Sequence, residues 1–235
     1  AEENRDFFSR AGCYVVNLIS SPGSGKTALL ECMAAHLGDG LAVIEGDLQT
    51  DRDAERIHKA GARAIQIETG GACHLDAQAV RHAADELALA SNPCRVLVIE
   101  NVGNLVCPAS FDLGQHFNIT LLSVTEGDDK PSKYPVMFRA ADLMLLTKTD
   151  LLAVLDDFDT DRAETNLRNL ASTAPVIALS SRKQDGMDGW LNWLDAQVEE
   201  QKQLVAAGKT RKPAIQPDGA ALHATDAQPH IHAQG

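Results

Sequence analysis

The stretch from Val15 to Leu30, VVNLISSPGSGKTALL, combines an apolar strand, a glycine-rich turn and the start of a helix. Glycines in the turn allow successive backbone N–H groups to converge on one point at the helix start, where an anion binds. A lysine there directs its charge to the terminal phosphates of a nucleotide, and a following threonine hydroxyl can coordinate a bridging Mg²⁺. The stretch predicts a phosphate-binding loop whose contacts come from Gly23, Ser24, Gly25, Lys26 and Thr27.

Ser20 is the one departure from the full loop pattern G-x-x-x-x-G-K-[ST], which has glycine at this position. Serine does not take positive φ freely, so we expect the loop to begin in an ordinary β conformation, with Pro22 fixing the turn that follows. A plain glycine-rich turn between two packed elements is the alternative. It does not explain why Gly-Lys-Thr opens a helix directly after a buried strand.

The length of 235 residues suits one large α/β domain with a buried core. The formal net charge of -12 argues against nucleic acid or an anionic membrane as a partner. No apolar run reaches the roughly 18 residues of a membrane span, and the polar N-terminal residues do not resemble a secretory signal. We expect a cytoplasmic protein. Because the chain does not begin with Met, we also expect a fragment or a processed form.

Apolar strands alternate with helical patterns along the chain, and the strands are expected at residues 15–19, 41–44, 62–67, 95–99, 119–124, 143–146 and 176–179. This alternation predicts an α/β fold with a doubly wound, mostly parallel sheet and right-handed crossovers. The polar segment TEGDDKPSKYP, residues 125–135, is too charged for the core and is expected to be a mobile loop.

The chain is expected to divide into a helical lead-in (1–12), the main domain (13–205) and a flexible C-terminal tail (206–235). The tail is rich in proline and poor in large apolar residues, a composition typical of disorder. Its histidines could bind a transition metal, although histidines in such tails are more often incidental. They are His223, His230 and His232.

Carboxylates follow two of the predicted strands, at the edge where open parallel sheets build their sites. Asp47 follows the strand at 41–44 and is a candidate ligand of Mg²⁺ or water. Glu100 follows the strand at 95–99, in the position whose carboxylate orders Mg²⁺ or water beside a γ-phosphate. Gly103 could donate its N–H to that phosphate. We therefore predict that Lys26, Asp47 and Glu100 are catalytic and that Thr27, Asp47 and Glu100 surround the Mg²⁺.

The segment Thr147-Lys148-Thr149-Asp150 follows a buried strand at the place where a nucleotide base would lie. The Asp150 carboxylate can accept hydrogen bonds from N1–H and N2–H₂ of guanine, a pair that adenine lacks, which favours GTP over ATP. The usual guanine motif is Asn-Lys-x-Asp. Thr147 keeps a hydroxyl but loses the two-sided hydrogen bonding of an amide. An exposed turn after a strand is the alternative.

Cys73, His74 and Cys107 are candidate ligands of a soft metal ion, because cysteine and histidine together suit Zn²⁺ or Ni²⁺. Free cysteine is usually a small buried hydrophobe, and for Cys73 and Cys107 both interpretations stay open. The five cysteines include no C-x-x-C pair, so a disulfide framework is not expected. The remaining cysteines are expected in the core: Cys13, Cys32 and Cys94.

Several segments resemble one family, the hydrogenase-maturation nickel GTPases (HypB). They are SSPGSGKT, EGDLQTDRDAERI, TGGACHLDAQ, ENVGNLVCPASFDLG, LLSVTEGDDKPSKYP, TKTD and GMDGWLNWL, and they span about Arg5 to Trp193. ENVGNLVCPASFDLG is the most diagnostic, because general GTPases share the phosphate loop but not this run. The resemblance implies a P-loop NTPase fold of the SIMIBI GTPase type.

The resemblance also implies a function: a GTP-hydrolysing metallochaperone that hands nickel to the large-subunit precursor of a [NiFe]-hydrogenase, with the help of an accessory protein. GTP or GDP, Mg²⁺ and Ni²⁺ or Zn²⁺ are the implied ligands. Lys148 and Asp150 would bind guanine, while Cys73, His74 and Cys107 would form a metal site at a homodimer interface. The cysteine- or histidine-rich N-terminal segment of many members is not part of this sequence.

Other functions remain as alternatives. The related urease accessory GTPase shares the architecture, but ENVGNLVCP argues against it. A metal-dependent dimerisation module with an idle nucleotide site would differ in showing little turnover. A small-molecule kinase would need an arginine-rich lid after the phosphate loop, whereas Arg52, Arg56 and Arg63 are scattered among acidic residues.

Overall fold

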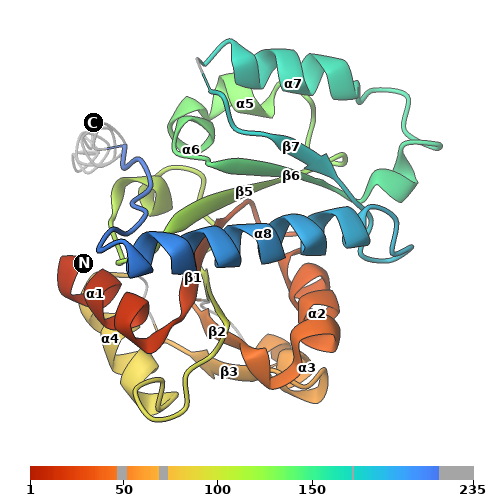
Figure 1. Ribbon diagram of the computed structural model, residues 1–235. Helices are drawn as coiled ribbons and strands as arrows, with labels where there is room; N and C mark the ends of the chain where they lie inside the picture. Colours follow the sequence, from red (N-terminus) through yellow and green to blue (C-terminus); the bar gives the residue numbers. More distant parts are fainter. Residues whose placement is uncertain (47–51, 69–73, 171, 217–235) are drawn as a thin grey trace, which may run out of the picture.

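The computed structural model describes residues 1–46, 52–68, 74–170 and 172–216, which form one seven-stranded sheet covered by helices on both faces (Figure 1). Its strand order is β3-β2-β4-β1-β5-β6-β7, and all described strand pairs run parallel. The strands are β1 (Tyr14–Ile19), β2 (Leu41–Glu45), β3 (Arg63–Gln66), β4 (Val96–Glu100), β5 (Phe117–Ser123), β6 (Leu143–Thr147) and β7 (Val176–Ala178). The predicted doubly wound parallel sheet is confirmed.

The two faces of the sheet carry different helices, because side chains along each strand alternate between faces. The helices are α1 (Glu2–Ala11), α2 (Lys26–Leu37), α3 (Arg52–Lys59), α4 (Ala77–Glu86), α5 (Lys130–Lys133), α6 (Pro135–Arg139), α7 (Thr160–Arg168) and α8 (Met187–Ala206), with 3-10 turns η1 (Gly38–Gly40), η2 (Cys107–Ser110) and η3 (Thr149–Leu151). In β1, Val16 and Leu18 pack with α2, α3 and α8, whereas Val15 packs with α1 and α4 and Ile19 with α6 and α7. Within the described ranges, no helix has both the length and the apolar character needed to cross a bilayer.

The N-terminal helix α1 is part of the packed body. Phe8 is fully buried, and so are the polar side chains of Asn4 and Arg5. The Asn4 amide donates to the Leu113 carbonyl over 3.0 Å, and the Arg5 guanidinium lies 2.5 Å from the Asp112 carboxylate. Because buried polar groups are stable only when paired, these contacts fix α1 against the chain that leads into β5.

A row of buried amide side chains crosses the interior of the sheet beside β1. Asn101 donates to Asn17 over 3.1 Å, Asn17 donates to Asn118 over 3.2 Å, and Gln115 donates to the same Asn118 oxygen over 3.0 Å. All four side chains are at most 1% exposed. We call these residues the amide row. Asn17 shares a face with Val15 and Ile19, so the row separates the apolar cluster under α1 and α4 from that under α6 and α7.

Replacing Asn17 by alanine is expected to lower the free energy of unfolding by about 1–3 kcal/mol, because the Asn101 amide loses its acceptor inside the protein. Urea unfolding followed by circular dichroism measures the change. The matched control is Asn92→Ala, the same substitution at an exposed position. Equal unfolding midpoints for the two variants would show that the amide row contributes no net stability.

Residues 125–135, predicted to be a mobile loop, instead contain a short helix and a buried anchor. Asp128 is 3% exposed and is held by the guanidinium of Arg162 and by the Asp159 N–H over 2.8 Å. The hydrogen bond from Arg162 lowers the pKa of the Asp128 carboxyl, so it stays ionised. The many charged residues of this segment suggested that it is exposed to solvent. The partners of Asp128 lie on α7 and just before it, more than 30 residues away in the sequence.

The C-terminal residues 209–216 also differ from the prediction, which placed them in a flexible tail. Helix α8 continues to Ala206, and the chain then turns back along the body of the domain (Figure 1). Arg211 lies against α8, and Gln216 donates its N–H to the Ala109 carbonyl over 3.0 Å. We call residues 209–216 the C-terminal strap. Residues 217–235, which include His223, His230 and His232, lie outside the described residues.

Candidate nucleotide and metal site

The predicted phosphate-binding loop connects β1 to α2 at the carboxyl edge of the sheet. Gly23 and Gly25 have φ of 76° and 97°, a region in which residues with side chains are strained, so both positions favour glycine. Ser20 is buried, and its φ is not positive. A φ of that sign is what the expected β conformation requires. Helix α2 begins at Lys26, directly after the loop, so its N-terminal N–H groups face the phosphate position.

Lys26 lies between the phosphate loop and the end of β4. Its ammonium is 3.0 Å from the Ser20 hydroxyl oxygen and 3.8 Å from a carboxylate oxygen of Glu100. The Ser20 hydroxyl donates to the Ser21 carbonyl over 2.9 Å, which leaves its oxygen able to accept from the lysine. Serine in place of the expected glycine thus supplies an acceptor for Lys26.

Two buried glutamates lie level with one another where β2 and β4 end. Glu45 and Glu100 are partners in the parallel register and are 2% and 6% exposed. The sequence predicted a role for Glu100 but assigned none to Glu45, although Glu45 also ends a strand. The candidate Asp47 lies outside the described residues.

Gly103 lies directly against the phosphate loop. A side-chain carbon placed on it would be 3.0 Å from Pro22 Cγ, tighter than most real contacts. The close approach therefore favours glycine at this position, and it places the chain after β4 beside the loop, as the prediction of a phosphate contact requires.

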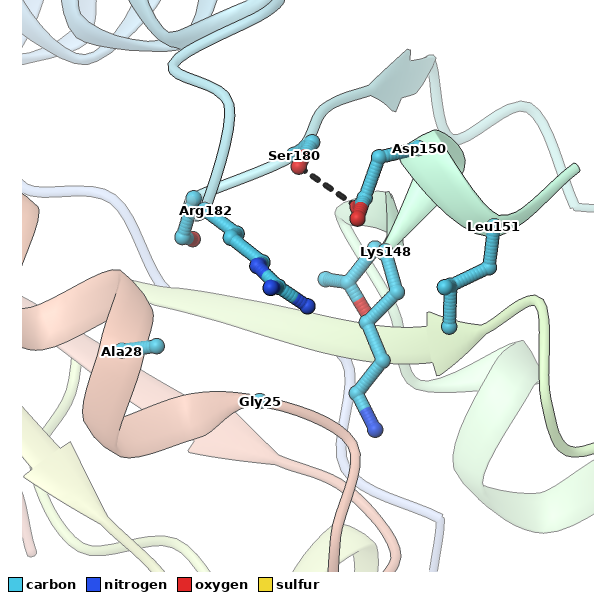
Figure 2. A pocket seen from close by; sticks show the side chains of 9 residues that line it. Gly25, Ala28, Lys148, Asp150, Leu151, Ser180 and Arg182 are labelled. Carbon is cyan, nitrogen blue, oxygen red and sulfur yellow. Dashed lines mark hydrogen bonds between the residues drawn. The ribbon is translucent and has the colours of Figure 1, made fainter.

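A cavity of about 230 Å³ lies between the start of α2 and the segments that follow β6 and β7 (Figure 2). At its edge, Asp150 Oδ1 accepts a hydrogen bond of 2.6 Å from the Ser180 hydroxyl, whose oxygen accepts the Lys183 N–H over 3.1 Å. This pair fixes the orientation of the predicted guanine-binding carboxylate. The lining residues are Gly25, Ala28, Thr147, Lys148, Asp150, Leu151, Ser180, Ser181 and Arg182.

Lys148 and Asp150, both predicted from the sequence to bind guanine, line this cavity together with the segment after β7, which had no predicted role. In Figure 2, Arg182 extends toward the space between α2 and Asp150. The only signal in the sequence was a polar turn, Ser-Ser-Arg, directly after the last predicted strand, at the sheet edge where sites form.

Thr147 and Lys148 connect this cavity to the predicted phosphate loop. The Thr147 hydroxyl donates to the Ser24 carbonyl over 2.6 Å, and the Lys148 ammonium donates to the Gly23 carbonyl over 2.6 Å. Lys148 has a left-handed backbone, with φ of 59°. Thr147, which stands in place of the asparagine of the usual guanine motif, thus makes a direct hydrogen bond to the phosphate loop.

Two of the metal candidates, His74 and Cys107, lie on segments that meet beside the end of β4. The His74 ring stacks on Phe111, with centroids 3.6 Å apart, and Phe111 directly follows η2, the turn that begins at Cys107. Cys107 is 1% exposed, and its N–H donates to the Asn104 side chain over 3.2 Å. Cys73 lies outside the described residues. Within the described ranges, no group of three or more His, Cys, Asp or Glu side chains could hold a metal ion.

Comparison with known proteins places the chain in a family. The family profile described as "CobW/HypB/UreG, nucleotide-binding domain" matches residues 14–178. The chain is 53% identical over 199 residues to the hydrogenase maturation factor HypB of Escherichia coli (strain K12), which covers 84% of this chain and 68% of that protein. Identity to HypB of Rhizobium leguminosarum bv. viciae is 52% over 197 residues, or 83% of this chain and 65% of that protein.

Solved structures support the same assignment. The crystal structure of HypB from Helicobacter pylori in complex with nickel has a TM-score of 0.78 and 44% identity, covering 84% of this chain and 93% of that one. HypB from Archaeoglobus fulgidus has a TM-score of 0.76 and 34% identity, covering 84% and 96%. The signal recognition particle 54 kDa protein from Aeropyrum pernix, at 12% identity and a TM-score of 0.50, shares the fold alone. The chain belongs to the CobW/HypB/UreG family of nucleotide-binding proteins and, within it, to the HypB hydrogenase maturation factors.

Proposed function

We propose that this protein is a GTPase that acts as a nickel metallochaperone in the maturation of [NiFe]-hydrogenase. The observation that carries the proposal is the direct connection of an oriented Asp150 carboxylate to a phosphate loop through Thr147 and Lys148. A guanine base held by Asp150 and phosphates held at the start of α2 can therefore be bound by one continuous site. The nickel-bound HypB relative supports the choice of cargo.

Hydrolysis depends on charge placed around the γ-phosphate. Thr27, Asp47 and Glu100 provide hard oxygen donors of the kind that Mg²⁺ prefers, and the ion would neutralise developing phosphate charge when bound. Lys26 would exchange its contacts with Ser20 and Glu100 for the terminal phosphates, while the loop N–H groups hold the phosphate oxygens. Asp47 or Glu100 would order the attacking water in line with the bond that breaks.

The cargo site would consist of Cys73, His74 and Cys107. Thiolate and imidazole ligands suit Ni²⁺ and also Zn²⁺. The Leu75 N–H, next to His74, donates to the Asn101 side chain over 3.3 Å, so this segment is attached to the residue that follows Glu100. Three ligands from one chain leave a coordination position that a second copy at a two-fold axis could fill. We therefore propose a homodimer whose metal site is coupled to the nucleotide.

Cys107→Ala is expected to weaken Ni²⁺ and Zn²⁺ binding at least tenfold and to remove its dependence on nucleotide, because Cys107 follows Glu100 and Gly103 on the same loop. The test is to titrate each metal into parent and variant, with GDP and then with a non-hydrolysable GTP analogue. Linkage requires that metal change GTP affinity by the same factor. Cys94→Ala is the matched control, since Cys94 is equally buried at the opposite end of β4.

Two results would contradict this assignment. Equal metal Kd values for the parent protein in both nucleotide states would exclude the coupling. Parent-like metal affinity in Cys107→Ala would exclude Cys107 as a ligand, in which case the thiol is a buried hydrophobe.

The acceptor of the nickel would be a hydrogenase large-subunit precursor, reached in the cytoplasm with an accessory protein. A urease precursor is the second candidate, because the relative from Helicobacter pylori (strain J99), 44% identical over 198 residues, is named a hydrogenase/urease maturation factor. Transfer of labelled nickel to each precursor distinguishes the two. A dimerisation module without catalysis would show metal-dependent dimers in gel filtration but no phosphate release.

A further inference from the structure

The C-terminal strap is anchored at its start by α8 and by α1. Arg211 donates to Gln197 over 2.5 Å and lies 2.9 Å from the Glu200 carboxylate, and its guanidinium is 5.3 Å from the centre of the Phe117 ring. The Lys212 ammonium lies 2.5 Å from the Glu2 carboxylate. These contacts on two helices and a strand direct the strap across the edge of the domain toward β5.

The strap ends against the turn that carries Cys107. The Gln216 N–H donates to the Ala109 carbonyl over 3.0 Å, and the Ser110 hydroxyl donates to the Gln216 carbonyl over 2.6 Å. The two hydrogen bonds run in opposite directions between the same pair of segments. Residue 216 is therefore bound to η2 through both its backbone groups. Figure 1 shows the blue strap beside the yellow-green chain that follows β4.

Cys107 itself is almost completely buried. A metal ion or a reagent can reach its thiol only when the packing around it opens locally, and movement of η2 is one way to open it. The Asn104 side chain, which accepts the N–H groups of Val106 and Cys107, holds the turn from within. The strap holds the same turn from outside, so the strap contributes to the position of Cys107 and to how often the turn opens.

We propose that the C-terminal strap is a positioning element for the metal site, with Ser110 and the backbone of Gln216 setting the place of Cys107. This inference rests on the proposed function, since it assumes that Cys107 binds the metal cargo. Removing a group that holds a metal ligand in position without contacting the metal typically lowers metal affinity by about 10- to 100-fold. The strap would therefore set metal retention without contacting the metal.

Two pairs of full-length variants test the proposal. Gln216→Pro removes the N–H that donates to Ala109, whereas Gln216→Ala keeps it and is the control. Ser110→Ala removes the hydroxyl that donates to Gln216, whereas Ser110→Thr keeps a hydroxyl and should rescue. For each variant we would measure Ni²⁺ affinity, the thiolate-to-nickel charge-transfer absorption and the alkylation rate of Cys107, resolved by peptide mass spectrometry. Thermal unfolding checks that each variant is folded.

The proline and Ser110→Ala variants are expected to bind Ni²⁺ about tenfold more weakly, with a weaker charge-transfer band, and to alkylate about tenfold faster. Gln216→Ala and Ser110→Thr should behave like the parent. If Cys107→Ala weakens metal binding but the strap variants match the parent in all three readouts, the inference about the strap is wrong. If Cys107→Ala leaves metal binding unchanged, the metal site is wrong, and faster alkylation in the strap variants would still show that the strap holds the turn.

Discussion

Replacing Lys26 by alanine is expected to lower kcat for GTP hydrolysis at least 100-fold while leaving the fold intact. The ammonium lies 3.0 Å from Ser20 and 3.8 Å from Glu100, directly at the start of α2, and the change removes a cation aimed at the transferred phosphate. Removing one preorganised electrostatic contact of this kind typically costs about 10²–10³ in rate. Phosphate release under saturating GTP measures the effect.

The control for this prediction is Lys59→Ala, which removes the same charge from a side chain that is 76% exposed at the end of α3. It should hydrolyse GTP at the parent rate. Circular dichroism and thermal unfolding establish that Lys26→Ala is folded. Turnover of Lys26→Ala within tenfold of the parent would exclude a phosphate-binding role for this lysine.

Asp150→Asn is expected to change the preferred nucleotide from GTP to xanthosine triphosphate. Guanine presents donors at N1 and N2, whereas xanthine has a carbonyl in place of the amino group, which an asparagine amide can pair with. Ser180 can still donate to the asparagine oxygen, so the orientation of the side chain is kept. A mismatched polar group in a site built for hydrogen bonding is strongly rejected, and we expect the ratio of the two affinities to change by roughly 100-fold or more.

Competition binding with both triphosphates measures this change. Asp156→Asn is the matched control, because it removes the same charge from an exposed side chain of the same connecting segment. A parent-like preference in Asp150→Asn would show that Asp150 does not face the base, and a shift in both variants would indicate a general effect of charge.

The parts of the site that the sequence predicted are those in which spacing alone determines the geometry. The loop from Gly23 to Thr27 and the carboxylate of Glu100 each follow a buried strand, and parallel strands bring their carboxyl ends to one edge of the sheet. The strands and the longer helices between them followed from hydrophobic periodicity, whereas the short helix α5 did not. For these elements, the structure of each residue could be predicted mainly from the residues next to it in the sequence.

The parts that the sequence did not predict depend on contacts between distant residues. Ser180 orients Asp150 from the segment after β7, and Asp128 is buried because Arg162 and the residues before α7 satisfy it. The composition of the strap, with few apolar residues, predicted disorder. That prediction did not include the contacts of Arg211, whose partners lie on α8. Composition predicts whether a segment can form its own core, and the strap packs instead on one that already exists.

The hydrogen bonds along the amide row run in one direction, because Asn101 donates to Asn17 and Asn17 donates to Asn118. At one end, the Asn101 oxygen accepts the N–H groups of Leu75 and Val102, which can only donate. At the other end, the Asn118 amide donates to the carbonyls of Ala140 and Ala214, which can only accept. The main-chain groups at both ends therefore fix the orientation of the Asn17 amide between them. If one amide turned by 180°, its oxygen would face a neighbouring oxygen, or its NH₂ group a neighbouring NH₂ group. Hydrogen bonds therefore connect Asn101, the residue after Glu100, through Asn17 and Asn118 to Ala214 in the strap.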